Sequence, residues 1–361
     1  MSAIIDRALS FCNRFQLRAP ILLAPMAGAC PPSLSIAVAN AGGLGACGTL
    51  LMQPAEILAW ADEVRANSPG AFQLNLWVPD PAPARDAVHE AEIRRFLAGW
   101  GPPVPAEAGD AWPLSFAEQC EAMLQANPPI ISSIMGLYPA SFVQRMKQHS
   151  IAWFATVTTV VEACAAEAAG ADVIVAQGAE AGGHRGCFEA AEAERKQVGL
   201  FSLLPSVVDA VRVPVVAAGG IADARGVVAA LVLGASAVQI GTGFLRCPEA
   251  KIHPAWAEAL ARTAPEETIV SRVFSGRAGR SIANPYALAA TAAGAPTPAP
   301  YPVQRGLTAA MRVAALKEGD IHRMQAWAGQ SAALAEAAPA ARVLQRVWDS
   351  AQALLESPSQ H

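Results

Sequence analysis

Short apolar runs alternate with helical patterns along the first 245 residues of the chain. Eight such runs begin at residues 21, 44, 72, 130, 152, 172, 214 and 237, and they read ILLAPM, LGACGT, FQLNLW, IISSIM, AWFATV, DVIVAQ, PVVAAG and AVQIGT. Their near-continuous hydrophobicity is typical of parallel strands that are covered on both faces. Strands that alternate with crossover helices indicate an α/β fold, and eight repeats close a barrel. We therefore predict a (β/α)8 TIM barrel with a small helical cap after its eighth strand.

An open, Rossmann-like sheet has the same alternation of strands and helices. The stretch GGLGACG is as rich in glycine as a dinucleotide-binding turn, but it precedes and fills a strand instead of opening a helix. The eight repeats also favour closure of the sheet, so the barrel is the preferred interpretation.

The chain divides into three predicted regions. Residues 1–245 form the barrel, and their proline-rich stretch at 78–129 is longer than a crossover needs, so we expect an insert with one or two helices over the barrel mouth. Residues 246–322 are expected to form the helical cap and the substrate region. Residues 323–361 are predicted to form a pair of alanine-rich helices that return to the barrel.

Composition excludes several classes of protein. With 53% hydrophobic residues and a net charge of −4, the chain can bury a large core and lacks the basic, aromatic-rich clusters that bind nucleic acid. No apolar run approaches the ~20 residues of a membrane span, and the charged N-terminus is unlike a secretory signal. The seven cysteines are scattered without metal-ligand spacing, so we expect a cytoplasmic protein without metal. The oligomeric state stays open, with a homodimer as one alternative.

Glycines follow the seventh and eighth predicted strands, at the end of the barrel where active sites form. Gly219 and Gly220 stand in AAGGIADARG, directly before a helix, and Gly241 and Thr242 stand in QIGTGF. A single glycine pair usually marks a tight turn, but TIM barrels often bind phosphate with the loops after strands seven and eight. Two such pairs at these positions predict a cradle of backbone amides for a phosphate group.

Residues at three other strand ends suggest what carries the phosphate. Ala24, Pro25 and Met26 follow the first strand, Asn75 lies in the third, and Gln177 ends the sixth. Amides suit the edge of a flat heterocycle that both donates and accepts hydrogen bonds, as the pyrimidine ring of a flavin does. We therefore predict FMN as the cofactor, although a bare sugar phosphate would leave Asn75 and Gln177 for the substrate.

The loop QGAEAGGHRG places one histidine among glycines after the sixth strand. Gly182 and Gly183 would let a planar cofactor lie close to the backbone, and His184 would then be carried over its ring. Histidine exchanges protons near neutral pH, so His184 is the candidate catalytic residue. The alternative is an exposed loop histidine without a role.

For Arg277 and Arg280, in SGRAGRS, a structural contact between cap and barrel is the preferred interpretation.

These stretches together resemble the nitronate monooxygenases, formerly called 2-nitropropane dioxygenases. The resemblance is carried by APMAGA, GGLGACGT, QLNL, VAQGAEAGGHRG, VVAAGGIADARG, AVQIGTGFL, GRAGRSIAN and WAGQS, and it covers roughly residues 20 to 335. It implies an FMN-containing barrel that oxidises an alkyl nitronate, or a nitroalkane, with molecular oxygen to a carbonyl compound and nitrite. The small-molecule substrate and oxygen are then the expected partners.

The resemblance also assigns flavin contacts. Ala24, Pro25 and Met26 would pack under the ring, and His184 matches the loop histidine of the family. The other expected contacts are Asn75, Gln177, Gly182, Gly183, Gly219, Gly220, Gln239, Ile240, Gly241, Thr242, Ala328, Gly329 and Gln330.

The chain departs from some members of the family after the fifth strand. Those members carry a catalytic histidine there, where this chain has Thr158, Thr159 and Glu162, and Thr156 or a neighbour replaces a lysine near the flavin. The departure favours preformed nitronates over neutral nitroalkanes, because a nitronate needs no strong base to remove a proton.

We hypothesise that a nitronate binds over the flavin near His184, whose positive or hydrogen-bonding form stabilises the anion. Two other functions stay open on the sequence. Flavin-dependent enoyl-thioester reductases, which consume NAD(P)H, share a similar barrel and the same glycine-histidine loop. A flavin-free barrel that binds a sugar phosphate is the second alternative.

Overall fold

Eight parallel strands form a closed barrel, as predicted. The computed structural model describes residues 2–111 and 113–356, so residue 112 of the insert and residues 357–361 of the predicted C-terminal helices lie outside the described part of the chain. The strand order is β1-β9-β8-β6-β5-β4-β3-β2, and the backbone of Leu44 closes the ring by bonding to Ile21 and Leu23 at 3.1 and 2.9 Å. The barrel strands are β1 (Ile21–Leu23), β2 (Gly45–Gly48), β3 (Phe72–Trp77), β4 (Ile130–Ile134), β5 (Ala152–Val157), β6 (Val173–Gln177), β8 (Val215–Ala218) and β9 (Ala237–Ile240).

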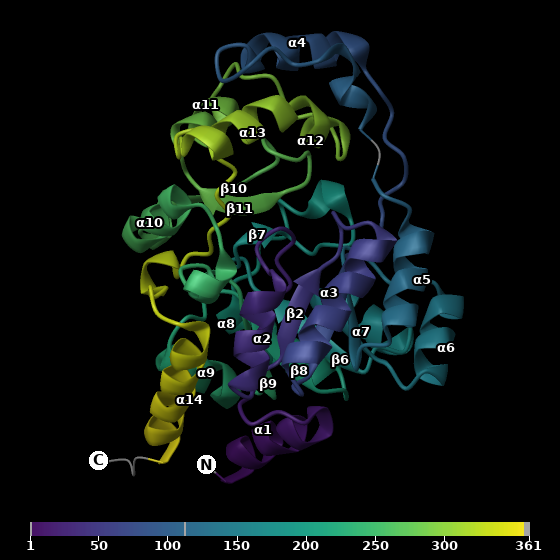
Figure 1. Ribbon diagram of the computed structural model, residues 1–361, viewed down its shortest axis with the longest axis vertical. Helices are drawn as coiled ribbons and strands as arrows, with labels where there is room; N and C mark the ends of the chain where they lie inside the picture. Colours follow the sequence, from purple (N-terminus) through teal and green to yellow (C-terminus); the bar gives the residue numbers. More distant parts are fainter. Residues whose placement is uncertain (1, 112, 357–361) are drawn as a thin grey trace.

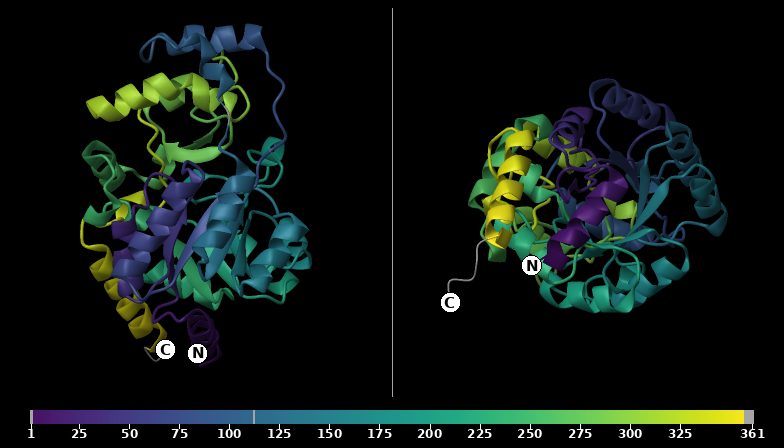
Figure 2. Two further views of the ribbon diagram at one scale, coloured as in Figure 1. Left: turned by 45° about the vertical axis from the view of Figure 1, so that its right-hand side comes forward. Right: turned by 90° about the horizontal axis from the view of Figure 1, so that it is seen from below.

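Crossover helices surround the barrel in a ring, which Figure 2 shows from below. They are α2 (Pro32–Asn40), α3 (Pro54–Asn67), α5 (Phe116–Ala126), α6 (Ala140–Gln148), α7 (Val160–Ala168), α8 (Leu200–Ala210) and α9 (Ala224–Val232). Side-chain caps fix where several of them begin. The Asp223 carboxylate accepts the Gly226 amide at the start of α9, and Thr159 and Glu162 form a capping box at the start of α7.

The amino ends of the strands are covered by α1 (Ser2–Phe15), a helix that the sequence analysis did not predict. Phe11 and Phe15 from this helix pack against Phe154 inside the barrel, and the Phe15 and Phe154 rings meet edge to face at 5.0 Å. The barrel interior is thus a packed core at this end, and any cavity must lie at the other end.

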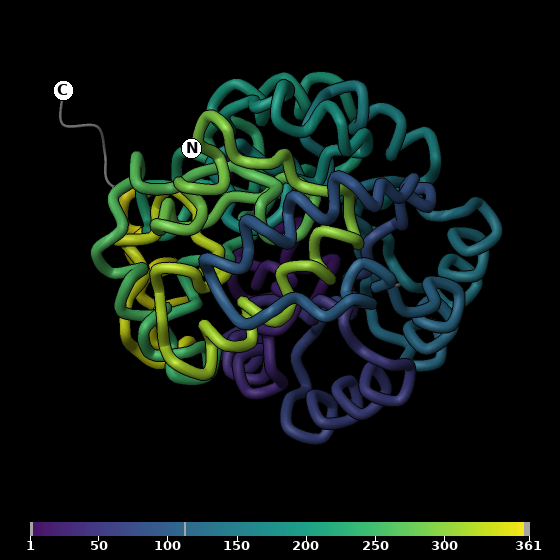
Figure 3. Tube along the Cα trace, turned by 90° about the horizontal axis from the view of Figure 1, so that it is seen from above, coloured from purple at the N-terminus to yellow at the C-terminus, as the bar shows by residue number. Residues whose placement is uncertain are grey.

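The insert is shorter than predicted because α5 belongs to the barrel wall, where it packs against α3. The rest of the insert carries α4 (Ala87–Leu97) and the 3-10 turn η1 (Ala106–Asp110). Ile93 and Leu97 of α4 join a core with cap residues such as Tyr286. In Figures 1 and 3, α4 therefore crosses the outer side of the cap rather than the barrel mouth itself.

The cap contains a small antiparallel sheet as well as the predicted helices. Its strands β10 (Thr268–Ser271) and β11 (Gly279–Ile282) pair with each other, and β11 also pairs with β7 (Gly183–His184) from the histidine loop. These strands were not predicted, since each has four residues or fewer and its partners are distant in sequence. The cap helices are α10 (Pro254–Arg262), α11 (Pro285–Thr291), α12 (Val303–Leu307) and α13 (Ala309–Glu318).

One long helix, rather than the predicted pair, ends the described chain. Residues 323–339 are mostly irregular and include the short 3-10 turn η6 (Ala332–Leu334), and α14 (Ala340–Glu356) then packs against α2 and α9 on the barrel wall. The irregular stretch is explained by backbone contacts of Gly329 and Gln330 with the barrel loops, which a helix could not make. No helix in the described chain has the length and apolarity needed to cross a membrane.

Candidate active site

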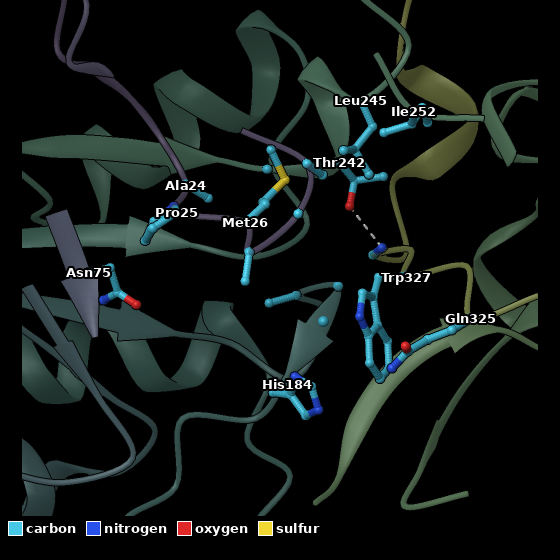
Figure 4. A pocket seen from close by; sticks show the side chains of 18 of the residues that line it. Ala24, Pro25, Met26, Asn75, His184, Thr242, Leu245, Ile252, Gln325 and Trp327 are labelled. Atoms are coloured by element: carbon cyan, nitrogen blue, oxygen red, sulfur yellow. Dashed lines mark hydrogen bonds between the residues drawn. The ribbon is translucent and has the colours of Figure 1, made fainter. Parts of the chain in front are cut away.

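A cavity of about 470 Å³ lies between the carboxyl ends of the barrel strands and the cap. Figure 4 shows that side chains from several strand ends and from the cap converge on it. The predicted site residues that line it are Ala24, Pro25, Met26, Asn75, Gln177, Gly182, Gly183, His184, Gly219, Gly220, Gln239, Gly241, Thr242 and Gly329. Three others do not line it: Ile240 and Ala328 are buried, and Gln330 is half-buried and donates its backbone amide to the carbonyl oxygen of Glu180.

Backbone amides are exposed to the cavity after β8 and β9. Gly219 and Gly220 have φ angles of +111° and +68°, a region that glycine enters without strain. Within the described chain, the amides of Gly219, Gly220 and Gly241 have no hydrogen-bond acceptor. Unpaired donors at adjacent strand ends are the groups that an anion such as a phosphate would satisfy.

The histidine loop, the end of β9 and the returning segment pack backbone against backbone. A Cβ atom on Gly182 would lie 2.5 Å from the nitrogen of Gly329 and 2.9 Å from Oγ1 of Thr242. The Gly329 amide donates to Thr242 Oγ1 at 3.0 Å, and the Gln330 amide donates to the carbonyl oxygen of Glu180 at 2.9 Å. Glycine at position 182 therefore permits this close approach, which joins the C-terminal segment to the barrel mouth.

The side-chain amides of Gln177 and Asn75, both predicted as flavin contacts, differ in their hydrogen bonds. Gln177 holds the loop, since its Nε2 donates to the His184 carbonyl at 3.0 Å and its Oε1 accepts the Gly186 amide at 2.8 Å. The side-chain Nδ2 of Asn75 donates to Ser132 Oγ at 3.0 Å, and its side-chain oxygen Oδ1 has no donor among the described residues. Asn75 thus retains an acceptor for a bound molecule, whereas the amide of Gln177 already has partners at both ends.

His184 contacts the rings of Trp77 and Trp327, each with its centroid 4.6 Å away. Its Nε2 is 2.8 Å from Ser275 Oγ. Burial, together with the nearby cations of Arg305 and Arg277, lowers the pKa of His184 to about 3. The imidazole is therefore neutral near pH 7, and of the two forms considered from the sequence, the hydrogen-bonding form is the one present.

The cavity lining is positively charged. Among the described residues that line it, Arg305, Arg312 and Lys251 carry positive charge and none is an aspartate or glutamate. Within the described chain no acceptor bonds to the Arg305 guanidinium, whereas Arg312 donates to Gln325 Oε1 at 3.3 Å and to two other oxygens. Burial lowers the pKa of Arg305 and brings that of Arg312 to about 10. A guanidinium group in a protein stays protonated at neutral pH. Such a cavity favours an anionic occupant.

Sequence reasoning missed several lining residues. Trp77 ends β3 and Trp327 begins the quoted motif WAGQS, so strand-end position and motif could have identified both. Arg305 comes from the cap and Gln325 from the segment that returns to the barrel, and no local sequence pattern gives the placement of either.

The positions at which the chain departs from some family members lie at the end of β5 and directly after it. Thr156 lines the cavity, but Thr158, Thr159 and Glu162 do not. The Glu162 carboxylate accepts the Thr158 hydroxyl at 2.8 Å and the Phe188 amide at 2.9 Å. These three residues therefore form a structural cap of α7 that also holds the histidine loop.

Comparison with known proteins gives the family. The family model described as nitronate monooxygenase matches residues 10–349. A nitronate monooxygenase from Paraburkholderia phytofirmans is 38% identical over 331 residues, which is 90% of each chain. The crystal structure of the nitroalkane oxidase from Streptomyces ansochromogenes has a TM-score of 0.84 at 33% identity and covers 94% of this chain and 98% of its own. FabK from Thermotoga maritima has a TM-score of 0.75 at 26% identity, with 96% and 97% of the two chains covered.

Fold and relatives together define an oxidoreductase of the TIM-barrel class, and the candidate site lies at the carboxyl ends of the strands. The chain belongs to the nitronate monooxygenase family. The general reaction of this family is the oxidation of nitronates.

Proposed function

We propose that the protein is an FMN-dependent enzyme that oxidises alkyl nitronates with molecular oxygen to a carbonyl compound and nitrite. The observation that carries the proposal is a cavity that has cationic side chains, no carboxylate among its described lining residues, and unpaired backbone amides at the ends of β8 and β9. Enzymes of the family are flavoenzymes in general, which supports the cofactor.

The residues present fit a flavin mononucleotide. The unpaired backbone amides of Gly219, Gly220 and Gly241 suit the phosphate of the flavin. The side-chain oxygen Oδ1 of Asn75, which has no donor among the described residues, suits an N–H at the edge of the flavin ring. Met26 borders the cavity and would pack against an apolar ring face. A bound flavin supplies the two-electron redox chemistry, while the protein supplies binding, orientation and charge.

The side chains of the cap and the histidine loop would hold the substrate. Arg305 offers a guanidinium without an anionic partner, and Gln325 has a buried Nε2 without an acceptor in the described chain. Both are donors suited to the oxygens of a nitronate. Trp77 and Trp327 contact the His184 ring and add apolar surface beside it. Bound in this way, the anion is oriented before any chemistry begins.

The state of His184 favours preformed nitronates as substrates. An imidazole whose pKa is lowered to about 3 is a weak base and removes a proton from a neutral nitroalkane poorly. The anion is instead held by the donors of Arg305 and Gln325. We therefore propose that neutral nitroalkanes are oxidised much more slowly than the corresponding nitronates.

An absorption spectrum followed by a nitrite assay tests the proposal. The purified protein should show a flavin spectrum, with FMN released on denaturation, and should form nitrite from propyl nitronate in air without nicotinamide. Oxidation of NADH that requires an enoyl thioester, without nitrite release, would instead establish the reductase alternative. A colourless protein that binds no added FMN would leave the sugar-phosphate alternative and overturn the proposal.

A further inference from the structure

A chain of polar contacts connects the insert to the face of His184 that points away from the cavity. Asp80, at the start of the insert, bonds through both carboxylate oxygens to Arg277 Nη1 at 2.9 Å. Arg277 is 2% exposed, and its Nη2 donates to the carbonyl oxygen of Cys187 at 2.6 Å. The backbone of Arg277 in turn contacts Ser275, whose hydroxyl oxygen lies 2.8 Å from His184 Nε2. The insert therefore reaches the catalytic candidate through only two intervening residues.

Hydrogen-bond accounting at Ser275 assigns the protons. The Ser275 hydroxyl has one hydrogen, and two acceptors are within reach, namely the Arg277 carbonyl at 3.1 Å and His184 Nε2 at 2.8 Å. The Arg277 carbonyl is buried and has no other donor in the described chain, so leaving it unpaired would destabilise the folded protein. If the hydroxyl donates to that carbonyl, Nε2 must carry the imidazole hydrogen and donate to Ser275. The other ring nitrogen, Nδ1, is then an unprotonated acceptor.

Nδ1 has no hydrogen-bond partner among the described residues, and His184 lines the cavity. Figure 4 shows its ring at the cavity edge, on the side opposite Met26 and Thr242. The neighbouring Trp77 and Trp327 contact the ring as aromatic surfaces. The contact with Ser275 is thus the polar contact that can select the tautomer.

We propose that Asp80, acting through Arg277 and Ser275, is a positioning residue that holds His184 in the tautomer with its hydrogen on Nε2 and leaves Nδ1 as an unprotonated acceptor at the cavity. Asp80 and the Cys187 carbonyl fix the Arg277 side chain from two sides, and this fixes the turn that carries Ser275. The inference rests on the proposed function in one respect, since it takes His184 as the group that faces the substrate. Its consequence is that the insert, which lies outside the barrel, sets the chemical state of a residue in the barrel mouth.

Nitrogen-15 NMR of histidine-labelled holoenzyme tests the tautomer directly. The wild-type protein should show a protonated, pyrrole-type Nε2 and an unprotonated, pyridine-type Nδ1 for His184, with the signals assigned by their loss in His184→Gln. In Ser275→Ala the selection is lost, so the two nitrogens should move towards averaged shifts. Asp80→Asn should move them in the same direction by a smaller amount.

Kinetics with propyl nitronate provide the second readout. Ser275→Ala and Asp80→Asn should lower kcat by about 10- to 100-fold, because small displacements of a catalytic group cost that much, while KM changes less than kcat. Asp80→Glu, which keeps the charge that pairs with Arg277, should recover part of kcat. Asp110→Asn is the matched control, since Asp110 lies in the same insert and pairs at 2.7 Å with Arg85, away from His184.

The outcomes separate the possibilities. A wild-type His184 protonated on Nδ1 overturns the assignment, and so does an Asp80→Asn protein with unchanged nitrogen shifts and unchanged kcat. Equal losses of kcat and melting temperature in Asp80→Asn and Asp110→Asn, with the tautomer unchanged, would show a merely structural role for Asp80. If the nitrogen shifts respond as expected but no nitronate yields nitrite, the positioning role stands and the proposed function fails.

Discussion

His184 shows how surroundings decide the chemistry of a single side chain. Histidine is usually the residue that changes charge near neutral pH, but here two arginines and burial act on it together and keep it neutral. The cavity still has a cationic group near His184, because Arg305 lines it and has no carboxylate partner in the described chain. The division of roles, with charge on arginine and hydrogen bonding on histidine, follows from the placement of these two residues.

Replacing His184 with asparagine should lower turnover and leave the cofactor in place. The loop backbone is held by Gln177, so the flavin site should survive the substitution. We expect kcat for propyl nitronate to fall by about 100-fold or more, the usual contribution of a positioned hydrogen-bonding or proton-transferring group. The measurement is nitrite formation beside the absorption spectrum, and unchanged turnover would remove His184 from the catalytic site.

The lowered pKa of His184 predicts a dependence of stability on pH. Between pH 6.5 and about pH 3 the unfolded chain binds a proton at this position and the folded protein does not, so acid favours unfolding. His184 should therefore steepen the loss of stability below pH 6.5 by at most about 1.4 kcal/mol per pH unit. Urea unfolding of the wild-type protein and of His184→Gln at pH 6.5, 5.5 and 4.5 checks this, since parallel curves for the two proteins would contradict it.

Among the elements, β7 connects the candidate site to the cap although it is only two residues long. It pairs with β11 of the cap, so a strand pair joins the histidine loop to the cap. Arg280 adds to this contact by donating to the carbonyl oxygen of Ala179 at 2.9 Å. Arg277 forms the salt bridge expected of a structural arginine, with Asp80 as its partner. The loop is therefore fixed between two parts of the molecule.

The substitution Gly182→Ala tests the contact between this loop and the returning segment. The new Cβ atom would meet backbone atoms of Ala328 and Gly329 at 2.7 and 2.5 Å, which cannot give way as a flexible side chain would. Overpacking of this kind costs about 1–3 kcal/mol. We expect weaker FMN binding by about 5- to 150-fold, measured by flavin fluorescence titration. Gly99→Ala is the control, since its Cβ would meet only the Phe96 carbonyl at 3.6 Å, and equal affinities in the two variants would refute the contact.

Elements with strong local signals could be predicted from the sequence, and elements defined by distant partners could not. The eight barrel strands are buried on both faces and therefore appear as continuous apolar runs. The strands β10, β11 and β7 exist through pairing across the chain, and a run of two to four residues carries no clear period. The site divides in the same way. Glycines at strand ends were identified, whereas Arg305 and Gln325 depend on where the cap and the returning segment lie.

At the scale of the whole molecule, the two ends of the barrel have different roles. The amino ends of the strands are covered by α1, whose aromatic side chains fill the core, and the carboxyl ends carry the cavity and the cap (Figure 1). In TIM barrels generally, residues at the first end serve stability and residues at the second serve catalysis. The two properties should therefore be separable by substitution.

The substitution Phe11→Ala should reduce stability and leave catalysis intact. Phe11 is 3% exposed and packs against Phe15 and Phe154 at the end of the barrel away from the cavity. Removal of a buried phenyl ring costs about 3–5 kcal/mol. We expect a lower melting temperature and an unchanged kcat for propyl nitronate at 25 °C, where the protein is still folded. A change in kcat comparable to that of a cavity substitution would show that the two ends are coupled.

The lack of acidic side chains among the described residues of the cavity lining also bears on how quickly a charged molecule can enter. The chain as a whole carries a net charge of −4 and repels an approaching anion at long range, while the arginines attract it only near the entrance. Dissolved ions screen exposed charges over roughly 10 Å at 0.1 M but act weakly on charges enclosed by protein. Moderate salt should therefore screen the long-range repulsion by the net negative charge but leave the attraction by the cavity arginines largely unchanged. The second-order rate of nitronate capture, followed as kcat/KM, should rise between about 0.01 and 0.1 M sodium chloride.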